Sequence, residues 1–330
     1  MSSDHEQDLV TQWLRSVDTA RTPVDAEPPA RLFALGERLT AEQLVRDRAR
    51  TRRRGVRVAW AVSVASLVVV AAIAVSSVLM MPAAQASTPT PLTFHSPAAE
   101  HQIIADAVKK LSAQDGVAAP ERSVREVSWA ISIEDGKIMG PVVPQIVELD
   151  WNADLSGVST IVKGRTEDPV DGHVGRVVPT DEEISKQTFG AGEFGVPSPD
   201  SPPATVAGVS EMLTMFGMPE HPTAGQLVES MVTVMDYWTL SDAQQAVLLK
   251  MIGQTGEARS LGRSVDRLGR DVEGLRIDSA TSGLTHAVLI SAETGRIVGV
   301  ETQRTTAEEG IPADTVVEYR MWDPERGEAG

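Results

Sequence analysis

Residues 223–253 read TAGQLVESMVTVMDYWTLSDAQQAVLLKMIG, and they determine the class of fold that the sequence predicts. Thr223 with Gln226, and Ser241 with Gln244, have the spacing of a capping box, so a helix is expected to begin at each pair. Each box is followed by an apolar stripe at helical spacing: Leu227, Val228, Met231, Val234, Met235 and Trp238, then Val247, Leu248, Met251 and Ile252. Gly253 is expected to end the second helix. The stretch therefore predicts two consecutive amphipathic helices.

Segments with the alternating pattern of half-buried strands lie on both sides of this helical block. Before it, strands are expected at 127–133, 147–151 and 158–162, and a helix at 101–111; after it, strands are expected near 260–265, 272–277, 284–291, 296–302 and 314–322. Ala292-Glu293-Thr294-Gly295 predicts a hairpin turn. Residues 166–204 lack periodicity and are predicted to form a long loop or lid. The pattern predicts an α+β fold, a curved antiparallel sheet with helices packed on one face.

Residues 58–81, VAWAVSVASLVVVAAIAVSSVLMM, contain no charged side chain over 24 positions. This length suffices for a tilted transmembrane helix. Seven arginines lie between 46 and 57, and the next basic residue after the segment is Lys109. The positive-inside rule therefore predicts a single-pass protein of the cytoplasmic membrane, with its N-terminus inside and its C-terminal domain outside. The alternative is secretion after cleavage near Ala86, because Ala84-Gln85-Ala86 resembles a signal-peptidase site.

These features divide the chain into five expected parts. Residues 1–57 form a cytoplasmic arm, 58–81 a transmembrane helix, 82–99 a tether rich in Pro, Ala, Ser and Thr, 100–322 an extracytoplasmic α+β domain, and 323–330 a flexible tail. The arm has two short apolar stripes, made of Leu9, Trp13 and Leu14, and of Leu32, Phe33 and Leu39. They predict either helices that fold on a partner or helices that rest on anionic lipid.

Composition excludes several classes of function. The net charge of −16 divides into +2 for residues 1–57 and −18 for residues 82–330, so the large domain would repel nucleic acid. The chain has no cysteine, which excludes disulfides, thiolate catalysis and cysteine-ligated metal sites. We expect no enzymatic activity, no cofactor and no metal site.

The local motifs also favour structural interpretations. Asp150-x-Asn152-x-Asp154 imitates a calcium loop, but the sixth and twelfth positions are Leu155 and Ile161, so a plain turn is favoured. His286 lies among apolar strand residues, where a packed, hydrogen-bonded histidine is expected. Met212, Met215 and Met218 have helical spacing, which favours core packing, with the lining of an apolar ligand cavity as the alternative.

The order of these features resembles an actinobacterial family of single-span membrane proteins, often encoded beside extracytoplasmic-function sigma factors. The resemblance is strongest from Met218 to Thr302 and includes Gly262-Arg263-Ser264-Val265-Asp266 and Glu293-Thr294-Gly295-Arg296-Ile297-Val298-Gly299. It implies an outer domain similar to the half-barrels of lipoprotein carriers and sigma-regulator sensors, and it supplies no catalytic residues. The absence of cysteine excludes the His-x3-Cys-x2-Cys zinc motif of many anti-sigma arms.

Topology and resemblance together lead to one functional hypothesis and one alternative. The first is a membrane-anchored, non-enzymatic regulatory or sensor protein, anti-sigma-like, whose arm engages a sigma factor or another cytoplasmic regulator. The alternative is an anchored extracytoplasmic module that binds a lipid or another apolar ligand. A continuous cavity above ~300 Å³ between the sheet and the helices, lined by apolar side chains, would favour the alternative, and a fully packed core would contradict it.

Overall fold

The computed structural model describes residues 88–322, except 114–115, 135–136, 140–141, 170–173, 202 and 308–310. The predicted arm, transmembrane segment and tail lie outside these residues, as do residues 82–87 of the tether. Among the helices that are described, none is both long and apolar enough to cross a bilayer.

The described part is an α+β domain built from a nine-stranded antiparallel sheet and four helices, which confirms the predicted fold class. The helices are α4 (Glu100–Ala113), α5 (Val206–Met215), α6 (Ala224–Met235) and α7 (Asp242–Thr255). The strands of the sheet are β1 (Ser123–Ala130), β4 (Gln145–Trp151), β5 (Gly157–Thr166), β6 (Val177–Phe189), β7 (Arg259–Val265), β8 (Asp271–Asp278), β9 (Leu284–Ser291), β10 (Ile297–Arg304) and β11 (Val316–Trp322). A separate hairpin consists of β2 (Ser132–Glu134) and β3 (Lys137–Met139).

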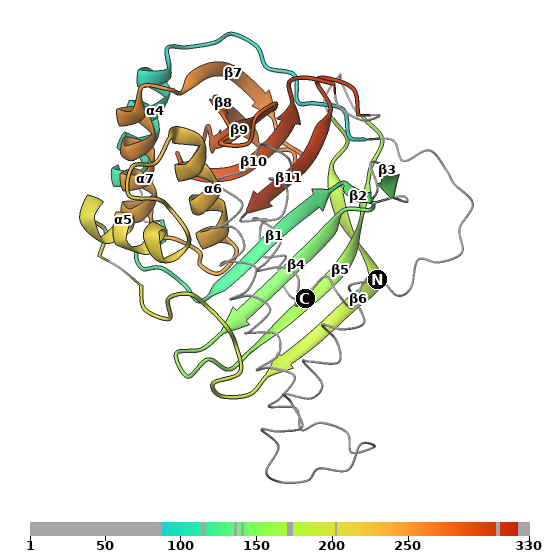
Figure 1. The fold of residues 1–330 in the computed structure, drawn as a ribbon, viewed down its shortest axis with the longest axis vertical. Coiled ribbons are helices and arrows are strands. Elements are labelled where there is room, and N and C mark those ends of the chain that lie inside the picture. Colours follow the sequence, from blue (N-terminus) through green and yellow to red (C-terminus); the bar gives the residue numbers. More distant parts are fainter. Residues whose placement is uncertain are drawn as a thin grey trace, which may run out of the picture. The chain divides into compact units, whose positions relative to one another are not determined.

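The strand order is β6-β5-β4-β1-β11-β10-β9-β8-β7, so β1 and β11 join the N-terminal and C-terminal strands into one sheet. Figure 1 shows the four helices gathered beside the β7–β11 half of the sheet, while β4, β5 and β6 extend away from them. This arrangement follows from the apolar stripes of the helices, which must be buried against one face of the sheet.

Each face of the sheet has its own apolar core. The helix-side core contains Val228 and Met231 of α6, Leu248 of α7, and Val288 and Val300 of the sheet, all nearly inaccessible to solvent. The opposite core contains Val127, Leu289, Tyr319 and Met321 of the sheet, with Leu92 from the segment before α4. Central strands are therefore buried on both faces, which explains the almost fully buried pattern of β9 and β10.

Both predicted capping boxes are confirmed. Thr223 and Gln226 exchange side-chain-to-backbone hydrogen bonds at the start of α6, and Ser241 and Gln244 do so at the start of α7. The expected end of α7 at Gly253 is wrong, because the helix continues to Thr255 and Gly256 adopts the left-handed conformation that ends it, with φ 68°. Gly253 instead allows close approach of α4, since a Cβ there would lie 3.1 Å from Ile104 Cδ1.

Two strand predictions require correction. Residues 166–204 were expected to be a loop, but β6 occupies Val177–Phe189 and pairs with β5. Because β6 is an edge strand in which one residue, Val177, is buried and the rest are exposed or half-buried, its sequence lacks the apolar alternation of a half-buried strand. The strand expected at 127–133 ends at Ala130, where its neighbour β11 is also beginning, and residues 132–134 belong to the β2–β3 hairpin.

The predicted turn at Ala292–Gly295 is confirmed between β9 and β10, and this hairpin holds two helices in place. Arg296 pairs with Asp242 and donates a 2.9 Å hydrogen bond to the Leu240 carbonyl, while Ile297 N donates to Gln245 Oε1 over 2.6 Å. Lys110 of α4 donates to the Ala292 carbonyl. The β9–β10 hairpin therefore joins α4 and α7 to the sheet.

Residues 90–95 belong to the described part of the predicted tether, 88–99, and run extended along the face of the sheet opposite the helices; we call them the strap. His95 pairs with Arg263 of β7 through two backbone hydrogen bonds of 2.7 and 2.8 Å. Arg267 donates to the Thr90 carbonyl over 2.8 Å, and Leu92 N donates to Glu301 Oε1 over 3.2 Å. The strap is therefore part of the folded domain.

Candidate functional site

A groove with a volume of about 580 Å³ lies between α4 and α7. The apolar side chains of Ile104, Val108 and Ala258 contribute to its walls. Gly256 leaves open space there, because a Cβ at this position would meet nothing within 4 Å, whereas Ile104 packs against Gly253. The other lining residues are Glu100, His101, Ala105, Lys109, Ser112, Lys250 and Gln254. Its volume falls within the range of small-molecule sites, roughly 300–1,000 Å³.

The groove carries basic charge in a domain that is otherwise strongly acidic. Of the six lysines in the chain, Lys109 and Lys250 both line it, although residues 82–330 carry a net charge of −18. Both side chains are exposed, and among the described residues neither ammonium forms an ion pair or a hydrogen bond. Glu100 is nine residues from Lys109 along α4, about 13 Å at the helical rise. The lining of the groove thus combines apolar side chains with two lysines.

A second polar group is buried where α6 meets the sheet. Arg320 of β11 lies against three carboxylates, which we call the Arg320 cluster: Asp236 at the C-terminal cap of α6, Glu318 on the same strand, and Glu126 of β1. The nearest atoms of Arg320 and Glu318 are 2.8 Å apart, and those of Arg320 and Glu126 are 4.0 Å apart. Glu126 and Arg320 are 4% and 7% exposed. The Glu318 side chain is 32% exposed, but Asp236 and Glu126 are largely shielded from solvent, and one guanidinium cannot neutralise all three carboxylates.

Protonation resolves this imbalance. Burial raises the pKa of Asp236 to about 7, with Arg320 opposing the shift and Glu126 and Glu318 adding to it. Burial also raises the pKa of Glu126, with the same opposition from Arg320 and a further increase from Glu318. The cluster therefore holds a proton near neutral pH. The carboxylate of Asp236 in addition lies at the negative end of the α6 dipole, which disfavours its ionised form.

His286, Thr302 and Glu229 form a polar group under α6. His286 Nδ1 lies 3.1 Å from Thr302 Oγ1, its Nε2 lies 3.5 Å from Glu229 Oε1, and Ser279 Oγ donates to the same oxygen over 2.7 Å. Burial opposes ionisation of Glu229, but the hydrogen bonds from His286 and Ser279 lower its pKa overall. The order hydroxyl–imidazole–carboxylate resembles a catalytic relay, yet the Thr302 hydroxyl lies on a 7% exposed residue beneath a helix. The prediction of a packed, hydrogen-bonded His286 is confirmed.

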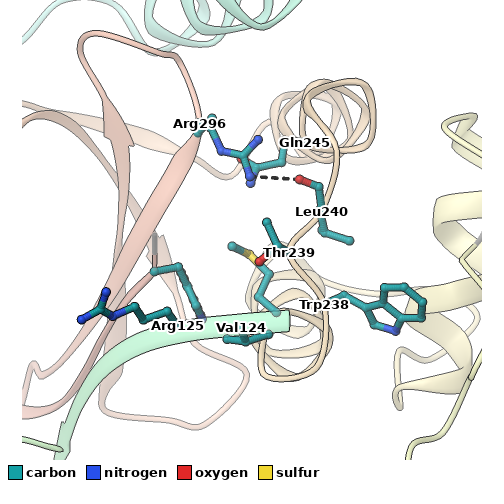
Figure 2. Close-up of a pocket in the computed structure, with 9 residues that line it drawn as sticks. Val124, Arg125, Trp238, Thr239, Leu240, Gln245 and Arg296 are labelled. Carbon is teal, nitrogen blue, oxygen red and sulfur yellow. Dashed lines mark hydrogen bonds between the residues drawn. The ribbon is translucent and has the colours of Figure 1, made fainter. Parts of the chain in front are cut away.

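A small cavity of about 10 Å³ lies between β1, the α6–α7 connection and the β9–β10 hairpin. Figure 2 shows Arg296 reaching toward the Leu240 carbonyl, with Gln245 beside it and the Trp238 ring directed away. The space is enough for a single water molecule. It belongs to the junction of α7 with the sheet and is too small for an organic ligand.

The predicted methionine site is divided between core and surface. Met212 and Met218 are 1% and 7% exposed and pack in the helix-side core, whereas Met215 is 46% exposed on α5. The three side chains thus do not share one surface. The predicted partner-binding residues Leu9, Trp13, Leu14, Leu32, Phe33 and Leu39 lie outside the described residues.

The Asp150–Asp154 segment contains the end of β4, which closes at Trp151, and the first residues of the turn to β5. Asp154 Oδ1 accepts hydrogen bonds from Ser156 Oγ over 2.7 Å and Ser156 N over 3.0 Å, and these bonds lower its pKa. Among the described residues, no three acidic or histidine side chains are grouped as metal ligands. The favoured interpretation as a plain turn agrees with these hydrogen bonds.

Sequence reasoning did not find the groove or the Arg320 cluster. The groove depends on Gly253 facing Ile104 of a helix about 150 positions earlier, which periodicity within one segment does not reveal. A signal for the cluster was present in the strand Val316–Trp322, where Glu318 and Arg320 interrupt an apolar run at the spacing of one sheet face.

No protein-family model matches the chain, and no curated protein sequence matches it. Among solved structures, a DUF1329 family protein from Desulfovibrio piger is 10% identical, with a match that covers 71% of this chain and 95% of that chain at a TM-score of 0.19. A similarity of this size carries no argument about fold or function.

Proposed function

We propose that the chain is a membrane-anchored, non-enzymatic regulatory or sensor protein of the actinobacterial sigma-linked type. Residues 58–81 anchor it, the half-barrel-like outer domain responds to an envelope condition or ligand, and the arm of residues 1–57 engages a sigma factor or another cytoplasmic regulator. The composition, the predicted topology and the sequence resemblance support this proposal.

The observation that carries the proposal is the packing of the strap. The chain that leads out of the predicted span enters the domain at Thr90 and is held there by Arg267, which is itself paired with buried Glu301. Residues 82–89 reach at most about 28 Å when fully extended. A change in the outer face of the sheet would therefore act directly on the segment that leads to the membrane.

The test is recovery of partners by the full-length chain, solubilised from membranes in mild detergent. The matched variant carries Leu9→Ala, Trp13→Ala, Phe33→Ala and Leu39→Ala in the arm, which removes the apolar stripes and keeps the charges. A sigma factor or another regulator bound by the native chain and lost from the variant would support the proposal. Identical sets of bound proteins would contradict it.

The second candidate function is an anchored module that binds a lipid or other apolar ligand outside the membrane. The groove between α4 and α7 supports it, since its volume of about 580 Å³ falls within the range of small-molecule sites. This groove lies between two helices and not between the sheet and the helices, where the core is packed. Retention of a small apolar molecule by the full chain, without any partner of the arm, would select this candidate over the first.

A further inference from the structure

We infer that the groove between α4 and α7 binds a single-chain amphiphile with an acidic head group, such as a long-chain fatty acid, with its acid group at Lys109 and Lys250. This assigns a ligand class to the outer domain. The inference does not depend on the arm, so the partner experiment and the ligand experiment fail independently.

The shape of the groove suits an acyl chain. It lies between two helices of 14 residues each, about 21 Å long, so a linear molecule can lie along it. Ile104, Val108 and Ala258 offer apolar contact, and the missing side chain of Gly256 provides depth. Burying a methylene group contributes about 0.8 kcal/mol. Several methylene groups in contact with these apolar side chains would therefore contribute a large part of the binding free energy.

The charge of the groove selects the head group. Lys109 and Lys250 come from different helices and line the same groove, and neither is neutralised by a carboxylate among the described residues. An acidic head group would interact with both ammonium groups, and Ser112, three residues after Lys109 on α4, also lines the groove. A cationic head group would meet two like charges. Among the described residues, one carboxylate lines the groove, that of Glu100, and it lies near the other end of α4.

Alternative occupants fit these observations less well. Nucleic acid is disfavoured by the net charge of −18 on residues 82–330. A neutral apolar molecule would leave the two lysines without a function. Other places in the domain do not suit an amphiphile. The cavity near Arg296 is too small to hold one, and Met212 and Met218 are packed in the core.

The experiment uses the full chain reconstituted in phosphatidylcholine vesicles, with a long-chain fatty acid that carries a diazirine on its acyl chain as the probe. After irradiation, labelled peptides are identified by mass spectrometry. We expect saturable labelling of peptides from 100–113 and 242–258. The unlabelled fatty acid should compete with the probe, whereas its methyl ester, which has the same chain and no charge, should compete weakly.

Two variants test the charge of the groove and its free space separately, and a third variant is the control. Lys109→Gln with Lys250→Gln should reduce labelling of these peptides roughly fivefold, given the usual strength of exposed ion pairs. Ala105→Trp keeps both charges and fills the groove from an exposed position on α4, so this variant should abolish labelling. Lys163→Gln with Lys186→Gln removes two lysines from β5 and β6 and should change nothing.

Three results would overturn the inference. The first is labelling that rises linearly with probe and spreads over the chain, which indicates partition into vesicles. The second is equal competition by the acid and its methyl ester. The third is labelling of 100–113 and 242–258 that survives both the lysine double variant and Ala105→Trp.

Discussion

Asp236, which caps the C-terminus of α6, forms an ion pair with Arg320 of β11, and this pair ties the helical layer to the centre of the sheet. Two further carboxylates share the same guanidinium. Because the side chains of Arg320, Asp236 and Glu126 are 9%, 15% and 5% exposed, solvent screens the cluster poorly. The ionisation state of Asp236 therefore contributes to the stability of the domain.

The first prediction concerns pH. The pKa of Asp236 rises from 3.8 to about 7 on folding, so the folded state holds a proton that the unfolded state releases between these values. Stability from this group is present below pH 4 and is lost as the pH rises toward 7. Asp236→Asn removes the titrating carboxyl group and with it this pH-dependent loss of stability. The free energy of unfolding of the variant, measured by urea denaturation, should therefore fall less between pH 4 and 8 than that of the native chain.

The control for this experiment is Asp278→Asn, since the side chain of Asp278 is 82% exposed. Its stability should follow the native curve at every pH. Parallel curves for Asp236→Asn and the native chain would show that Asp236 ionises in the folded state as it does in the unfolded state, and would contradict the prediction.

The second prediction removes the guanidinium of the cluster. Arg320→Met leaves Glu126, Asp236 and Glu318 without their shared cation, and loss of one partner of a buried ion pair costs about 3–5 kcal/mol. The loss should be smaller at pH 5 than at pH 8, because the remaining carboxylates can take up protons. Arg276→Met, at a position 46% exposed, is the matched control and should cost within about 0.5 kcal/mol. Equal losses for the two variants would refute a role for the cluster.

The third prediction concerns the strap. Arg267 contacts Glu301, the Thr90 carbonyl and the face of Tyr319, with its guanidinium carbon 4.6 Å from the ring centroid. Arg267→Met should release residues 88–95 from the sheet, so limited proteolysis of the full chain should cut there at least about tenfold faster, as expected when local opening becomes about 1.4 kcal/mol easier. Arg263→Met removes an exposed arginine from β7, the strand that precedes Arg267, and should leave the cleavage rate unchanged.

The sequence was sufficient for the elements whose signal is local. The capping boxes at Thr223 and Ser241 set the starts of α6 and α7 within a few residues, and the turn at Ala292–Gly295 marked its hairpin. The sequence was insufficient for elements whose contacting residues lie far away along the chain. The edge strand Val177–Phe189 is held by backbone pairing with β5, which the sequence pattern does not show. Because its side chains are mostly polar and show little apolar alternation, the sequence predicted a loop there. The groove and the Arg320 cluster depend on contacts between distant segments, which no window of sequence contains.

The last prediction tests whether the β9–β10 hairpin fixes the helices. Gly295 has φ 77°, and a Cβ there would lie 2.4 Å from the Ala107 carbonyl oxygen of α4. Gly295→Ala therefore adds a backbone clash to the strain of a left-handed alanine. Gly192 also has φ 77°, but its added Cβ meets nothing within 4 Å, so Gly192→Ala carries the strain alone, about 1 kcal/mol. Gly295→Ala should lower the free energy of unfolding by at least about 2 kcal/mol more than Gly192→Ala, because α4 must move to accommodate the methyl group. Equal effects in urea denaturation would mean that α4 is not held closely against the hairpin.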